Sequence, residues 1–145
     1  FNRIDAHNFS GINYGAWCNF DNPDKKDKLF EQSAKSLKEI GKVCEDLDIS
    51  WNMEVVNRFE SCMLNTAKEA RVLADMVDNP KINILLDIFH GMIEEDDLAE
   101  AIRIVGKDRL GHYHMGSNTP ERVLLAVAGR LRRIKGNRLR QMHIL

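Results

Sequence analysis

The sequence lacks a long apolar run and contains few prolines and cysteines. Its 145 residues include three prolines and three cysteines, and no apolar stretch approaches the roughly 20 residues that a membrane helix needs. The first residues also lack the basic segment followed by an apolar one that is typical of a secretory signal. We therefore predict a cytoplasmic protein with no membrane partner.

The cysteines and the charge balance exclude further classes. Cys18, Cys44 and Cys62 are odd in number, widely spaced and form no C-x-x-C motif, so neither a disulfide framework nor a zinc knuckle is indicated. The formal net charge is -1, which gives no overall reason to expect nucleic acid as a partner. With 43% hydrophobic and 30% charged residues, the composition is that of an ordinary globular domain.

Apolar periodicity divides the chain into alternating strands and helices. Asn22-Pro23-Asp24 is a helix-start signal, and the apolar residues after it recur every three or four positions over roughly 24 residues. Asn65-Thr66 and Asp96-Asp97 are plausible helix starts, and Asn79-Pro80 and Gly106 are plausible stops. The pattern predicts strands over Ile49–Val56, Ile82–Ile88 and Leu110–His114, with helices over Thr66–Val77 and Asp96–Val105.

This alternation predicts an α/β fold of βα units with parallel strands. A complete eight-unit βα barrel needs about 250 residues, so we expect a partial (β/α)8 TIM barrel of about four βα units over residues 1–118. A flavodoxin-like sheet is an alternative, although no glycine-rich phosphate loop follows any strand.

Residues 119–145 differ in composition from the rest of the chain and are predicted to form a basic helical tail. The sequence after Glu121 has no acidic residue, and the tail has seven basic ones. A solvated helix face is the preferred interpretation, and contact with nucleic acid is the alternative. A shifted reading frame would also explain this composition.

Polar side chains recur near the ends of successive predicted strands. Glu54 lies in the first clear strand after the long helix, Asp87 ends the next, and His112 and His114 end the one after that. A lone residue of this kind is more often a cap than a ligand, but βα barrels build their sites at the carboxyl ends of strands. A mixed carboxylate and imidazole set suits a divalent ion such as Mn²⁺, Co²⁺ or Mg²⁺.

Four stretches of the sequence resemble one enzyme family. The segments "NMEVVNRFE", "LNTAKEA", "LLDIFHGMIEEDDLAEAIR" and "LGHYHMG" are similar to the ketose 3-epimerase group (D-tagatose or D-psicose 3-epimerases) of the xylose isomerase-like barrels. The resemblance covers residues 1 to about 116. It implies a metal-dependent isomerase of carbohydrate metabolism that epimerises C3 of a free, small-molecule ketose through an enediolate.

The resemblance also implies roles for individual residues. Glu54 would be both a metal ligand and the catalytic acid/base. Asp87 and His114 would be further metal ligands, with Mn²⁺ as the expected ion and Co²⁺ or Mg²⁺ as substitutes. The substrate-binding residues would be Glu60 and His90, on the sugar hydroxyls, and Trp17, against the apolar edge of the sugar.

The resemblance ends near Gly116. In the family, a later strand carries a second catalytic glutamate, and no residue after Glu121 matches it. We therefore expect a truncated fragment whose turnover as an isolated chain is in doubt, and exposed sheet edges that favour a homo-oligomer. The alternatives are a sister activity such as hydroxypyruvate isomerase and a non-catalytic half-barrel binding module.

Most apolar residues of the predicted strands are expected to fill the core between sheet and helices. For Phe59 and Phe89, which neighbour proposed site residues, a place in the core is preferred over a wall of the sugar pocket. The predicted core of the strands comprises Met53, Val55, Val56, Ile84, Leu85, Leu86, Leu110 and Tyr113.

Overall fold

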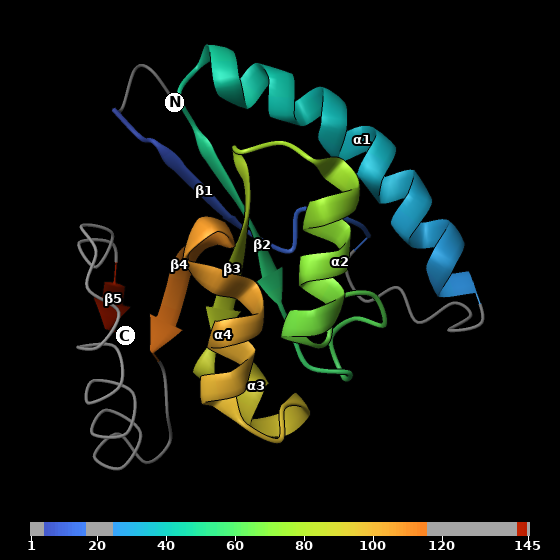
Figure 1. The fold of residues 1–145 in the computed structure, drawn as a ribbon, viewed down its shortest axis with the longest axis vertical. Coiled ribbons are helices and arrows are strands. Elements are labelled where there is room, and N and C mark those ends of the chain that lie inside the picture. The colour runs from blue at the N-terminus through green and yellow to red at the C-terminus, as the bar shows by residue number, and fades with distance from the viewer. Residues whose placement is uncertain (1–4, 17–24, 116–141, 145) are drawn as a thin grey trace.

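The computed structural model describes residues 5–16, 25–115 and 142–144. Its strands form one sheet in the order of the chain, and every neighbouring pair is parallel. Figure 1 shows this sheet partly covered by helices on one face. The predicted half-barrel of parallel βα units is therefore confirmed. The strands are β1 (Asn8–Gly11), β2 (Ser50–Val55), β3 (Ile82–Asp87), β4 (Leu110–Met115) and β5 (Met142–Ile144).

Of the four helices in the described residues, three follow the predicted pattern and one was not predicted. α1 (Lys26–Asp46), α2 (Ala67–Val77) and α4 (Leu98–Arg109) match the expected helices, whereas the short α3 (Ile88–Glu94) follows β3 directly. The helix expected in the basic tail lies outside the described residues. Among the helices that are described, none is both long and apolar enough to cross a membrane.

Side-chain caps mark where α2 and α4 begin, whereas α1 has no side-chain cap. Thr66 and Glu69 form a capping box at the start of α2, in which each side chain accepts a hydrogen bond from the other residue's backbone N–H. Asp97 accepts from the N–H of Ala99 at 2.7 Å and begins α4. Gly106 has φ of 72° and interrupts the regular helix, as a stop signal should.

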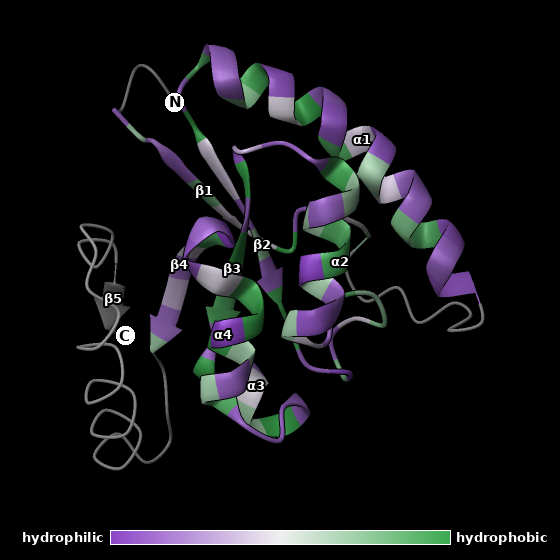
Figure 2. Cartoon of the chain, in the orientation of Figure 1, coloured by the Kyte–Doolittle hydropathy of each residue, from purple (hydrophilic) through white to green (hydrophobic). Residues whose placement is uncertain are grey.

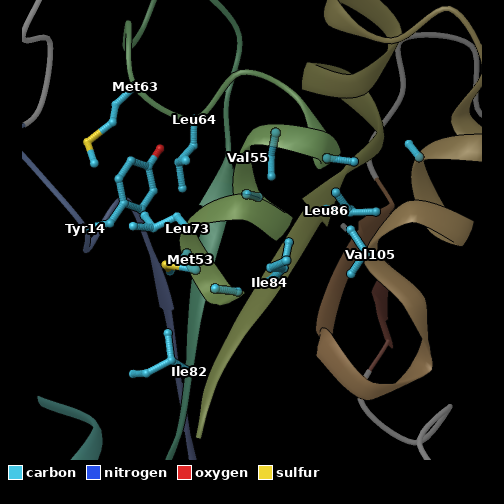
Figure 3. Packing of buried hydrophobic residues seen from close by; sticks show 14 of the residues in the cluster. Tyr14, Met53, Val55, Met63, Leu64, Leu73, Ile82, Ile84, Leu86 and Val105 are labelled. Atoms are coloured by element: carbon cyan, nitrogen blue, oxygen red, sulfur yellow. The ribbon is translucent and has the colours of Figure 1, made fainter. Parts of the chain in front are cut away.

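The core lies between the strands and the helices that cover them. Met53, Ile84, Leu73 and Val105, from two strands and two helices, are completely buried and belong to one apolar layer, shown in Figure 3. In Figure 2 the apolar colour is concentrated on β3, while α1 is largely hydrophilic with recurring apolar positions. This pattern is expected when a parallel strand is covered and a helix is covered on only one side.

Most of the predicted core residues are buried, but the prediction was wrong for Phe59 and Phe89 and only partly confirmed for Leu110. Leu110 is only partly buried and packs against the edge of the core. Phe59 is 72% exposed and Phe89 is 47% exposed, so neither fills the core. Both follow the carboxyl ends of strands, where the chain leaves the covered part of the sheet, and this position explains their exposure.

Candidate metal centre

Three charged side chains from three adjacent strands meet at the carboxyl end of the sheet. Nδ1 of His114 lies 3.3 Å from Oε1 of Glu54 and 3.3 Å from Oδ2 of Asp87. Asp87 and His114 are direct partners in the register of β3 and β4. The Glu54 and Asp87 side chains are only 16% and 14% exposed. The parallel sheet therefore brings together the three residues predicted as metal ligands.

The two carboxylates strongly favour a positive charge between them. Hydrogen bonding to Asp87 and Glu54 raises the pKa of His114 to about 9, against the opposing effect of burial. Burial acts to raise the pKa of Asp87, but hydrogen bonds from His114 and from the backbone N–H of Phe89 outweigh it and leave this pKa lowered. The site thus attracts a proton or another cation.

Asp87 links the site to the unpredicted helix α3. Its Oδ1 accepts hydrogen bonds from the backbone N–H groups of Phe89, at 2.6 Å, and His90, at 3.4 Å. Its Oδ2 faces His114 instead. The carboxylate therefore begins α3 with one oxygen and offers the other to the site, so the helix cap holds the side chain in place.

His90 and His114 both lie close enough to the two carboxylates to be candidate metal ligands. Ligand atoms of Glu54, Asp87 and His90 lie within 4.8 Å of one another, and His114 contacts both carboxylates. The ring of His112 lies edge-on to that of His114, with centroids 5.0 Å apart. A donor set of two carboxylates and an imidazole fits Mn²⁺, Co²⁺ or Mg²⁺ better than an ion that prefers thiolate ligands.

A buried amide joins the two residues predicted to bind the sugar hydroxyls. Nδ2 of Asn57 lies 3.1 Å from Oε1 of Glu60 and 2.8 Å from Nδ1 of His90. Asn57 and His90 are 3% and 8% exposed. Asn57 was not among the predicted site residues, although an asparagine two residues before Phe59 and three before Glu60 is a recognisable signal for a local side-chain turn.

An ion pair and backbone hydrogen bonds hold the loop after β2 against α3 and the residue that follows it. Arg58 donates from Nε and Nη2 to the Glu94 carboxylate at 3.0 and 2.8 Å, and its backbone N–H donates at 2.7 Å. The hydrogen bonds from Arg58 lower the pKa of Glu94, whose side chain is 4% exposed. Glu95 accepts from the N–H of Ala67 at 2.6 Å. The loop that carries Asn57 and Glu60 is therefore fixed from two sides.

Of the six residues predicted to form the site, five are brought to one end of the sheet. Trp17, expected against the sugar, lies outside the described residues. Phe59 and Phe89 are exposed beside this end of the sheet, which is compatible with the wall of a pocket but not with the core.

A family comparison matches most of the chain. The family described as a xylose isomerase-like TIM barrel matches residues 4–125. Curated relatives include D-psicose 3-epimerases from Enterocloster bolteae, 39% identical over 114 residues, and from Ruminiclostridium cellulolyticum, 36% identical over 115 residues. These matches cover 78% and 79% of this chain but only 38% and 39% of the relatives.

Solved structures agree with the fold. A D-psicose 3-epimerase from Clostridium cellulolyticum H10, crystallised with D-tagatose, superposes with a TM-score of 0.77 at 28% identity and covers 98% of this chain and 50% of its own. An L-ribulose 3-epimerase superposes with a TM-score of 0.71 at 26% identity, over 84% of this chain and 45% of its own. The chain thus spans about half the length of these structures.

Proposed function

We propose that this chain, which belongs to the xylose isomerase-like TIM barrel family, carries one catalytic half of a metal-dependent ketose 3-epimerase. Its relatives at 36 and 39% identity are named D-psicose 3-epimerases. The solved neighbours were crystallised with D-tagatose or in the presence of D-fructose. These names support a free ketose as the substrate class.

The observation that carries the proposal is the convergence of Glu54, Asp87 and His114. Two carboxylate oxygens each lie 3.3 Å from one imidazole nitrogen, at the end of the sheet where βα barrels place their active sites. Two anions so little exposed need a cationic partner. A divalent metal ion would satisfy them more fully than the single charge of a protonated histidine.

In this proposal, Glu54, Asp87 and neutral His114 hold the metal ion, which would polarise the carbonyl of the ketose. Glu54 also takes the proton from C3 as the general base. The Glu60 carboxylate accepts from a sugar hydroxyl, and His90 binds a second hydroxyl. Trp17 would close the apolar side of the sugar. Return of the proton to the opposite face needs a second acid, for which the described residues offer no assigned group.

Self-association and a cytoplasmic location are further parts of this proposal. β1 and β5 are the two edge strands of the described sheet, and an edge strand readily pairs with another chain. Size-exclusion chromatography with light scattering would show a mass above the 16.7 kDa of one chain.

Calorimetric titration with Mn²⁺ tests the metal centre without requiring turnover. We expect saturable one-site binding by the chain and its loss in Asp87→Ala. Asp97→Asn is the matched control, because Asp97 also begins a helix but lies outside the proposed donor set. Equal binding by the chain and Asp87→Ala, or no binding by either, would contradict the proposed centre.

Exchange of the C3 proton in D₂O tests the chemistry. With Mn²⁺ present, we expect NMR to show deuterium entering C3 of D-psicose, D-tagatose or D-fructose, because one base suffices for exchange. Glu54→Gln should abolish it. A metal-loaded chain that incorporates no deuterium into any of these ketoses would favour the non-catalytic binding module instead.

A further inference from the structure

The orientation of the Asn57 side chain is determined by a backbone group. The N–H of Phe59 lies 3.0 Å from one terminal atom of that side chain. A backbone N–H can only donate, so this atom must be the amide oxygen. The other terminal atom is therefore the NH₂ group, which can only donate.

The NH₂ group of Asn57 in turn determines which nitrogen of His90 carries the proton. It lies 2.8 Å from Nδ1 of His90 and 3.1 Å from Oε1 of Glu60, so its two hydrogens have one acceptor each. Because a donor faces Nδ1, this nitrogen must present its lone pair. A neutral imidazole whose Nδ1 accepts carries its proton on Nε2.

We propose that Asn57 is a positioning residue that holds His90 in the Nε2–H tautomer and thereby assigns it to the sugar rather than to the metal. The inference rests on the proposed ketose site and adds a division of roles. Glu60 is held as a hydrogen-bond acceptor for one hydroxyl of the ketose. His90 is held as a donor, through Nε2–H, for another.

The same geometry decides between the two candidate histidine ligands. A metal ion needs a free lone pair on a ring nitrogen. In His90 the Nδ1 lone pair is engaged by Asn57 and Nε2 carries a proton, so neither nitrogen is available, although His90 lies near both carboxylates. In His114, Nδ1 faces two carboxylates and becomes a ligand once its proton leaves. His114 is therefore the metal ligand.

Long-range ¹H–¹⁵N NMR of the histidine rings tests the assignment directly. In the unaltered chain, with His90 identified by loss of its signals in His90→Gln, we expect the Nε2–H tautomer. Addition of Mg²⁺, the diamagnetic ion of the proposed set, should shift the ring signals of His114 and leave the tautomer of His90 unchanged. A proton on Nδ1 of His90, or direct coordination of His90, would overturn the proposal.

Asn57→Asp reverses the polarity at one position with almost no change in shape. Its carboxylate still accepts from the Phe59 N–H, but its second oxygen now accepts from His90 and draws the proton to Nδ1. Nε2 is then free, so we expect Mg²⁺ to shift His90 as well as His114. If the new charge beside Glu60 prevents folding, Asn57→Asp combined with Glu60→Gln restores a donor and acceptor pair and gives the same readout.

Asn65→Asp is the matched control. Asn65 lies in the same loop and its NH₂ group donates to the carbonyls of Val56 and Ser61, so the substitution disturbs the loop without facing His90. It should leave the tautomer of His90 unchanged, and an equal change in both variants would overturn the proposal. Failure of Mn²⁺ binding in calorimetry would instead contradict the proposed function, while the tautomer in the metal-free chain would still be measured.

Discussion

The sheet carries two polar layers that are chemically opposite. The layer at the carboxyl end contains Glu54, Asp87 and His114, which are all ionisable, and His114 contacts both carboxylates. The layer nearer the amino end contains Ser50, Asn52 and Asn83, which are all neutral. Alternation along β2 places Ser50, Asn52 and Glu54 on one face of the strand, so the two layers are neighbours.

The neutral layer satisfies much of its hydrogen bonding within the protein. Asn52 is completely buried, and its Oδ1 accepts from the Ser50 hydroxyl at 3.1 Å. Its Nδ2 lies 3.1 Å from Oγ of Ser10, and Nδ2 of Asn83 donates to Oγ of Ser50 at 3.0 Å. Amides and hydroxyls are both donors and acceptors, so they can partner one another.

The charged layer cannot do this, because carboxylates only accept. Glu54 and Asp87 both turn to the single nitrogen of His114, and the resulting rise in the pKa of His114 shows how strongly a cation is favoured. The comparison teaches that a buried neutral layer stabilises the fold, whereas a buried anionic layer indicates binding.

The largest expected loss of stability comes from a substitution at Gly111, which lies against the neutral layer. A Cβ at this position would lie 1.8 Å from Oδ1 of Asn52 and 2.7 Å from Cβ of Asn83. Gly111→Ala should therefore lower the free energy of unfolding by about 3 kcal/mol, measured by urea denaturation. Gly91→Ala is the control, because its added Cβ would meet the flexible tip of the Leu98 side chain and, at 4.0 Å, Cγ of Glu95, rather than a fixed amide. Equal losses of stability in the two variants would show that the neutral layer does not restrict position 111.

Glu54→Gln should lower Mn²⁺ affinity strongly and stability only slightly, the reverse of Gly111→Ala. Removal of a direct ligand should weaken Mn²⁺ binding by about 100-fold or more, the upper end of the range for losing even an outer-shell partner. His114 keeps its ion pair with Asp87, so we expect a smaller loss of stability than in Gly111→Ala, measured without metal. A variant that loses stability but not Mn²⁺ affinity, by calorimetry, would remove the distinction between the layers.

The pH dependence of metal binding should follow His114. Since its pKa is raised to about 9, Mn²⁺ must displace one proton below that pH, and affinity should rise about tenfold per pH unit between pH 6 and 8. In the metal-free chain the sign is reversed. The stabilisation from protonated His114 is complete below its unfolded pKa of 6.5 and is lost as pH rises through 9. A flat affinity profile would exclude His114 as a ligand.

The smallest expected effect is a difference in stability that separates the helix-capping role of Asp87 from its metal-binding role. Asp87→Asn keeps an oxygen to accept from the N–H groups of Phe89 and His90, whereas Asp87→Ala removes it. In the absence of metal, the alanine variant should be less stable than the asparagine variant by about 1 kcal/mol. Both should lose Mn²⁺ binding. Equal stability of the two variants would show that the cap of α3 contributes nothing measurable.

Local signals in the sequence predicted much of the fold. Asn65-Thr66 was predicted to begin α2, and Thr66 caps this helix in the structure, where it forms a capping box with Glu69. Ile84, Leu85 and Leu86 were predicted to lie in the core, and all three are buried in β3, as expected of a parallel strand that is covered. α3 was not predicted, because its first residue, Ile88, continues the apolar pattern of the strand and was assigned to that strand.

The site could be predicted only in part. The ligand types and their positions at strand ends were visible, because parallel strands bring their carboxyl ends to one edge. The role of Asn57 was not visible, since it depends on His90, which is 33 residues away in the chain. The exposure of Phe59 and Phe89 was also missed, because the hydrophobicity of a residue does not reveal how far the covering helices extend.

The sequence by itself determined the order of β2, β3 and β4 and of the three longer helices, the starts of α2 and α4, and the residue types at the strand ends, because these follow from local periodicity and local hydrogen bonding. Only the tertiary structure decided which side chains meet. It placed two carboxylates against His114 and a donor amide against His90, and these long-range contacts determine the charge of one histidine and the tautomer of the other. Identical imidazoles thereby acquire different chemistry, because the properties of a titratable ring depend on the groups that the fold brings to it.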